Sequence, residues 1–195
     1  MRASPAGLSS FVFAAVLILQ VGCGKPFDVK KNVKFPATEP AANAEAGSVT
    51  IHALALVDED ALYDAFDANL ILAGVLAIRV KLSNAGSEPV ELKGLRFELR
   101  SEAGTAFERL DARGAYKRLM SYYKISNYNI AGYKESRGDF ESYALNGSVP
   151  LAGGDAREGL IFFRVPSEAD RAGLVLVAQG LQPKSAAIKL KLGKP

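Results

Sequence analysis

The chain has 195 residues, of which 49% are hydrophobic and 23% are charged, a composition that suits one globular domain with a hydrophobic core. Its formal net charge of +3 is close to balance, which argues against a dedicated nucleic-acid-binding protein. With one cysteine and one histidine, the chain has neither an internal disulfide nor a cysteine zinc cluster, and we expect no metal or cofactor.

Residues 1–22 have the organisation of a secretory signal peptide. Arg2 supplies a positive start, residues 11–19 form an apolar run, and Gly22 places a small residue before the chain's cysteine. The run is shorter than the roughly 20 apolar residues that a transmembrane helix needs. The alternative is a plain secretory signal with an incidental cysteine at its end.

Residues 19–23, Leu-Gln-Val-Gly-Cys, resemble the lipobox of bacterial lipoproteins, although Gln20 stands where an aliphatic residue is usual. The resemblance implies that Cys23 becomes the mature N-terminus, with a diacylglyceryl thioether and usually an acylated amine. Two or more acyl chains, such as palmitate, anchor a protein stably to a membrane. Gly24 differs from the aspartate of an inner-membrane retention signal, so the resemblance favours the outer membrane, facing the periplasm.

Residues 23–47 are predicted to be a flexible, lipid-anchored tether. Pro26, Pro36 and Pro40 interrupt any periodicity, and residues 38–47 are small and polar without a hydrophobic face. A solvated linker is the favoured interpretation, and contact with anionic lipid is the alternative. The lysines available for such contact are Lys25, Lys30, Lys31 and Lys34.

Residues 48–195 are predicted to form one mainly β domain. It starts with a buried strand over residues 49–57, and Asp58 then begins a short helix with an apolar stripe at Leu62, Phe66 and Leu70. The acids near Asp58 lack the spacing of a calcium-binding EF-hand loop. His52 is expected to be packed within its strand, so neither feature indicates a metal site.

Period-two alternation of apolar and polar residues marks the strand at residues 74–84. Residues 90–100 are predicted to return beside it as a hairpin, with a bulge at Gly94 where the alternation changes phase. Residues 106–109 are expected to continue the meander. Three later strands are predicted over residues 159–165, 173–178 and 186–192. This succession indicates an antiparallel β-sandwich.

A strand that ends in Asn84, a following hairpin and a Gly-x-x-x-Phe-x-x-Pro pattern over residues 159–166 form a common outline. This outline resembles the immunoglobulin-like domains of uncharacterised bacterial envelope lipoproteins. The resemblance covers about residues 48–192 and implies an antiparallel immunoglobulin-like β-sandwich. It implies no catalytic residues.

An insertion at about residues 110–145 is the chain's compositional anomaly, because six of the chain's seven tyrosines lie between Tyr116 and Tyr143. Helical spacing relates Tyr116, Leu119 and Tyr123, so we expect the insertion to be partly helical. Tyrosine and arginine are enriched at interfaces, which makes the insertion a candidate binding surface. The alternative is that it covers one end of the sandwich. The candidate residues are Arg113, Tyr116, Lys117, Tyr122, Tyr123, Tyr128 and Tyr133.

The sequence shows no motif that would indicate an enzyme. Cys23 is used by the predicted anchor, and neither a Walker A loop nor a GxGxxG motif occurs. We therefore expect a lipid-anchored envelope protein that acts as a non-catalytic binding or assembly module. Its expected partner is an envelope protein or an anionic glycan, and not a nucleic acid. A purely structural envelope lipoprotein is the alternative, and a hydrolase with an unrecognised site is a distant one.

Overall fold

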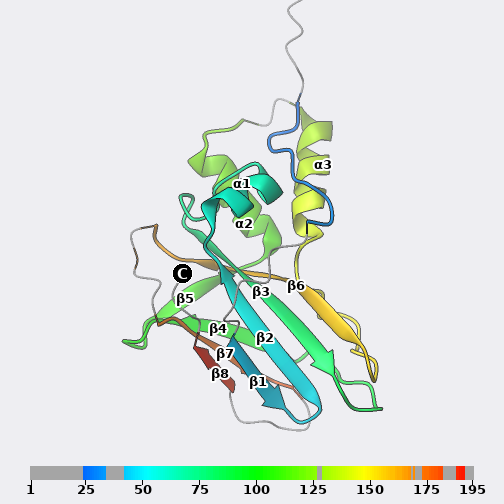
Figure 1. The fold of residues 1–195 in the computed structure, drawn as a ribbon. Coiled ribbons are helices and arrows are strands. Elements are labelled where there is room, and N and C mark those ends of the chain that lie inside the picture. Colours follow the sequence, from blue (N-terminus) through cyan, green and yellow to red (C-terminus); the bar gives the residue numbers. More distant parts are fainter. Residues whose placement is uncertain are drawn as a thin grey trace, which may run out of the picture.

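The computed structural model describes residues 24–33, 42–126, 129–167, 169 and 173–181, and the backbone of residues 188–191. Cys23 and Tyr128 lie outside the described residues. The elements in chain order are β1 (Ala42–Ala46), β2 (Val49–Leu56), α1 (Glu59–Phe66), β3 (Val75–Asn84), β4 (Arg96–Arg100), β5 (Ala106–Leu110), α2 (Ala112–Tyr122), α3 (Ile130–Glu141), β6 (Ala156–Arg164), β7 (Val175–Gln179) and β8 (Ile188–Lys191). Figure 1 shows the three helices gathered at one end of the sheet.

The described strands form one antiparallel sheet in the order β1-β2-β3-β6-β5-β4-β7-β8, which curls into a half-barrel. This confirms the predicted mainly β, antiparallel class. The division into two facing sheets, as in an immunoglobulin-like sandwich, is not confirmed. β5 pairs with β6 at Leu110↔Phe162 and with β4 at Leu99↔Phe107, so one continuous ladder joins the two halves.

The two faces of the sheet cover different hydrophobic cores, because side chains alternate along each strand. On β3, Leu76 and Ile78 join an inner core that fills the curl of the sheet, together with Leu99 of β4 and Leu176 of β7. Ala77 points to the opposite face and joins a second core beneath the helices. The predicted alternation along residues 74–84 is therefore confirmed, and one strand takes part in both cores.

The helices α1, α2 and α3, which we call the helical cap, each begin at a side-chain cap. Asp58, Asp111 and Asn129 accept hydrogen bonds from backbone N–H groups in the first turns of their helices. The predicted helix after Asp58 and the helical part of the insertion are confirmed. α3 was missed because glycines at positions 132 and 138 and scattered polar residues leave it without a clear apolar stripe.

The predicted hairpin between residues 74–84 and 90–100 is wrong, because β3 pairs with β2 and β6 and not with β4. The buried side-chain amide of Asn84 donates to the carbonyls of Glu88 and Leu151 and holds the chain after β3 in a turn. Gly94 is not a bulge in a strand. It lies in a turn against Gly180, whose positive φ of 88° and lack of a Cβ allow the two backbones to touch.

The prediction of a flexible tether over residues 23–47 is wrong for residues 24–33 and 42–46, which are folded. Residues 42–46 form β1, which pairs with β2 in the register Ala44↔Ile51. Its alternating alanines pack on the inner core while Asn43 and Glu45 are exposed, a weak pattern that small side chains conceal in the sequence. Residues 24–33 pack on the helical cap, and the folded domain therefore begins well before residue 48.

Candidate functional site

The N-terminal segment, residues 24–33, is docked into the helical cap. Phe27 and Val29 are each only 3% exposed and belong to the core beneath the helices. The backbone N–H of Lys30 donates to the carbonyl of Ala65 in α1 at 2.9 Å. Figure 1 shows this segment running alongside α3. The stretch that follows the predicted anchor directly is therefore part of the folded structure.

Hydroxyl groups of the cap hold the backbone of this segment. Ser136 of α3 donates to the carbonyl of Phe27 at 2.7 Å, and Tyr116 of α2 donates to Ser136 at 2.9 Å. Tyr143 donates to the carbonyl of Lys30 and accepts from the N–H of Val33. Buried backbone groups need such partners when no strand or helix supplies them.

Ion pairs at the surface join the same two parts of the chain. Lys25 pairs with Glu135 of α3 at 2.9 Å, and Lys31 pairs with Asp139 at 3.3 Å. The hydrogen bond from Lys25 to Glu135 raises the pKa of the lysine. Lys25 and Lys31 therefore form ion pairs with carboxylates of the cap. The sequence had left open contact between these lysines and anionic lipid.

Three of the candidate binding residues face the interior of the cap. Tyr116 is 0% exposed, and burial raises its pKa. Tyr123 accepts from the N–H of Asn69 at 2.9 Å, and burial raises its pKa to about 12. Tyr133 packs edge-on against Tyr116 at 5.7 Å and lies beneath the guanidinium of Arg137. The expectation that Tyr116 belongs to a binding surface is therefore corrected.

The other candidate residues remain on the surface where the structure describes them. Tyr122 is 48% exposed and contacts Tyr123 edge-on at 5.0 Å. Lys117 is exposed on α2, and Arg113 is exposed with an ion pair to Glu141 at 3.7 Å. Tyr122 also lines a pocket between the cap and the sheet, which makes that pocket the candidate site.

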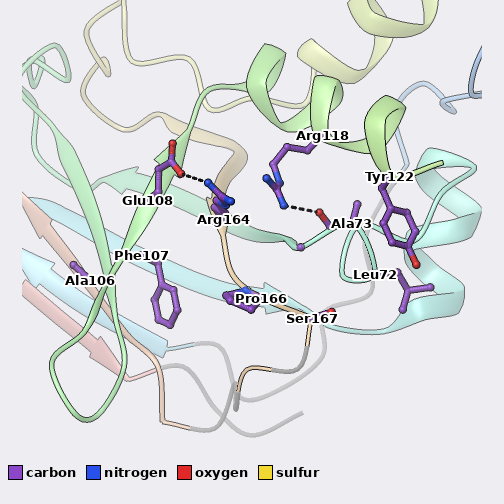
Figure 2. A pocket seen from close by; sticks show the side chains of 11 residues that line it. Leu72, Ala73, Ala106, Phe107, Glu108, Arg118, Tyr122, Arg164, Pro166 and Ser167 are labelled. Carbon is purple, nitrogen blue, oxygen red and sulfur yellow. Dashed lines mark hydrogen bonds and ion pairs between the residues drawn. The ribbon is translucent and has the colours of Figure 1, made fainter. Parts of the chain in front are cut away.

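The candidate pocket has a volume of about 450 Å³ and lies where α2 passes over the ends of β5 and β6 (Figure 2). Two arginines line it, Arg118 from α2 and Arg164 from the end of β6, together with Tyr122 and Leu72. Glu108 of β5 pairs with Arg164 at 3.3 Å. The pocket thus combines two guanidinium groups with one carboxylate, beside exposed apolar and aromatic surface.

Arg118 lines this pocket and is held in place by the backbone. Its Nη2 atom donates to the carbonyl of Ala73 at 3.3 Å, and its buried Nε has no partner among the described residues. Gly74, with a positive φ of 68°, leaves the space that the guanidinium occupies, since a Cβ there would lie 3.1 Å from Nη2. A fixed guanidinium with an unused N–H suits a carboxylate, phosphate or sulfate group.

Within the described residues, no group of three or more His, Cys, Asp or Glu side chains is arranged to hold a metal ion. None of the helices in that part of the chain is both long and apolar enough to cross a membrane. Comparisons with protein-family models, with curated proteins and with solved structures find no match for this chain. Its function is therefore inferred from the geometry of the site itself.

Sequence reasoning missed Arg118, Arg164 and Glu108 as site residues. Arg118 falls within the basic insertion, whereas Glu108 and Arg164 become neighbours only through the pairing of β5 with β6. No local pattern relates these two positions, which are 56 residues apart. The burial of Phe27 could have been predicted, because apolar residues 27 and 29 alternate with polar residues at positions 28 and 30.

Proposed function

We propose that the protein is a lipid-anchored, non-catalytic binding or assembly module of the bacterial envelope, held at the outer membrane through lipid on Cys23. The leader that resembles a lipobox supports the anchor. The pocket between α2 and the sheet supports the binding role and is the observation that carries it. We also propose that the domain is related to the immunoglobulin-like domains of envelope lipoproteins. In this chain the strands would form one curled sheet where those domains have two facing sheets.

The recognised feature is an anionic group on an envelope protein or glycan. Arg118 is fixed by Ala73 and Arg164 is exposed beside Glu108, so an incoming carboxylate or phosphate meets one positioned and one adjustable guanidinium. Tyr122 adds an aromatic wall that is half exposed before binding. Both arginines lie on regular secondary structure, which positions them better than loops do.

Partner capture tests the binding role. We expect the Tyr122→Ala/Arg164→Gln variant to lose a cross-linked partner from intact envelopes while its urea unfolding midpoint changes little, because both side chains are exposed. Arg96→Gln is the matched control, since Arg96 is exposed on β4 and, among the described residues, bonds only the nearby carbonyls of Lys93 and Leu95. Equal capture by all three chains would refute a binding role for the pocket.

The anchor is tested separately by Cys23→Ser in the full chain. We expect this change to abolish incorporation of labelled fatty acid, because the thioether cannot form, and to move the protein to the soluble fraction when membranes are washed at high salt. Unchanged membrane fractionation together with unchanged lipid labelling would contradict the lipoprotein assignment.

A purely structural envelope lipoprotein is the second candidate function. The observation that favours it is that Tyr116, Tyr123 and Tyr143 bond within the cap or to the N-terminal segment. Under this alternative the tyrosine-rich insertion serves only to pack the core. The Tyr122→Ala/Arg164→Gln variant then changes neither the captured partners nor the composition of the envelope.

A further inference from the structure

One face of the helical cap carries unpaired positive charge. Residues 112–134 contain five lysines and arginines and no acidic residue. Within the described residues, Lys117, Lys124 and Lys134 have no ion pair, whereas Lys25 and Lys31 pair with Glu135 and Asp139, and Lys30 pairs with Asp64 of α1. These three lysines are exposed, and their positive charge is available to a partner outside the domain.

Apolar side chains lie among these charges. Lys117 and Lys124 line a shallow hollow of about 340 Å³ together with Met120, Ile125 and Tyr133. Nearby in the chain, at the start of α3, Ile130 is 67% exposed. We call Lys117, Lys124, Ile125 and Ile130 the basic cap face; Met120 is only 7% exposed and belongs to the core beneath it. Lysines around single apolar side chains are typical of surfaces that rest on lipid headgroups.

The beginning of the docked segment lies at the same end of the molecule. The carbonyl of Gly24 would be 3.2 Å from a Cβ on Gly132, in the first turn of α3. Lys25 is already paired with Glu135, and Phe27 is buried. Only Gly24 stands between Cys23 and this docked stretch, and consecutive Cα atoms are about 3.8 Å apart. An anchor on Cys23 therefore leaves the cap very little distance from the lipid.

We propose that the basic cap face lies directly on an anionic lipid surface, so that the domain is oriented by the membrane and not suspended from a long tether. The proposal deepens the proposed function and rests on the anchor at Cys23. Charge complementarity favours the membrane over a protein partner, because a lipid anchor on Cys23 would hold this face next to a surface that contains anionic headgroups. The far end of the half-barrel then points away from the membrane.

Vesicle binding by the unlipidated mature chain tests the face without depending on the anchor. The Cys23→Ser chain is mixed with phosphatidylglycerol-containing vesicles and with phosphatidylcholine vesicles. We expect binding to the anionic vesicles only, lost at high salt, and weakened roughly 30-fold by Lys117→Gln/Lys124→Gln, since each lysine near an anionic surface contributes about fivefold.

Lys81→Gln/Lys93→Gln is the matched control, because these lysines are exposed on β3 and in the loop before β4, away from the cap. The control removes the same net charge and is expected to bind within about threefold of the parent chain, since salt screening weakens the attraction of lysines that do not face the bound surface. An equal loss in both double variants would show a net-charge effect and overturn the proposal, as would binding that neither variant changes.

A fluorescent probe gives an independent reading of contact. An environment-sensitive label on Ile130→Cys, in the Cys23→Ser chain, is expected to shift to the blue on anionic vesicles, and the same label on Lys81→Cys is not. Absence of a shift at Ile130→Cys on anionic vesicles would overturn the membrane proposal. Failure of the anchor shows in the fatty-acid labelling of the full chain and leaves the vesicle assay unaffected, so the two failures are distinguishable.

Discussion

Replacement of Phe140 by alanine is expected to lower the free energy of unfolding by about 3–5 kcal/mol, the range for truncation of a buried aromatic residue. Phe140 of α3 is 0% exposed. Its ring stacks on Phe162 of β6 at 5.2 Å and contacts Phe66 of α1 at 5.3 Å and Tyr116 of α2 at 5.6 Å. One side chain therefore joins all three helices to the sheet.

Urea unfolding measures this loss, and Tyr122→Ala is the control within the same insertion. Tyr122 is about half exposed, so we expect its truncation to cost less than about 1 kcal/mol. Phe140→Leu replaces the alanine variant if that variant does not fold. Its free energy of unfolding is expected to fall by less than that of Phe140→Ala. Equal and small losses for Phe140 and Tyr122 would mean that the insertion is a surface loop and not part of the core.

Replacement of Phe27 by alanine is expected to undock the N-terminal segment and to lower the free energy of unfolding by about 3 kcal/mol, at the lower end of the range for a buried aromatic residue. Phe27 lies edge-on to Tyr116 and Tyr123, at 5.8 Å from each ring. The loss is limited by the docking energy of the segment, because the segment can leave while the sheet stays folded.

Lys31→Ala is the control for this change, since its pair with Asp139 is exposed on the lysine side and such pairs contribute little. The Phe27→Ala chain is also expected to show increased protease cleavage between residues 24 and 33. A Phe27→Ala chain as stable and as protease-resistant as the parent would contradict the docked arrangement.

Most strands and the first helix were predictable because their signals are local, whereas the small side chains of β1 left no clear alternation. Alternation along residues 74–84 identified β3, and the acidic cap at Asp58 identified α1. Strand order was not predictable in the same way. β3 and β4 are neighbours in the chain but not in the sheet, because the side chain of Asn84 and the contact of Gly94 with Gly180 redirect the chain between them.

The candidate site was only partly predictable, for a similar reason. Composition indicated the insertion as a whole, yet it could not separate Tyr116, which is buried, from Tyr122, which is exposed. That difference depends on which helical face packs against the sheet. The partners that bury Tyr116 include Phe27, which lies 89 residues earlier in the chain and had been assigned to a flexible tether.

The chain is folded onto the helical cap from Gly24 onward, and amide hydrogen exchange of residues 24–33 tests this arrangement most directly. The N–H of Lys30 donates to Ala65, and that of Val33 donates to the hydroxyl of Tyr143. Both amides are therefore expected to exchange much more slowly than in an unstructured peptide, and to lose this protection in Phe27→Ala. Exchange of both amides at the unstructured rate in the unmodified sequence would show a free tether and contradict the docked anchor segment.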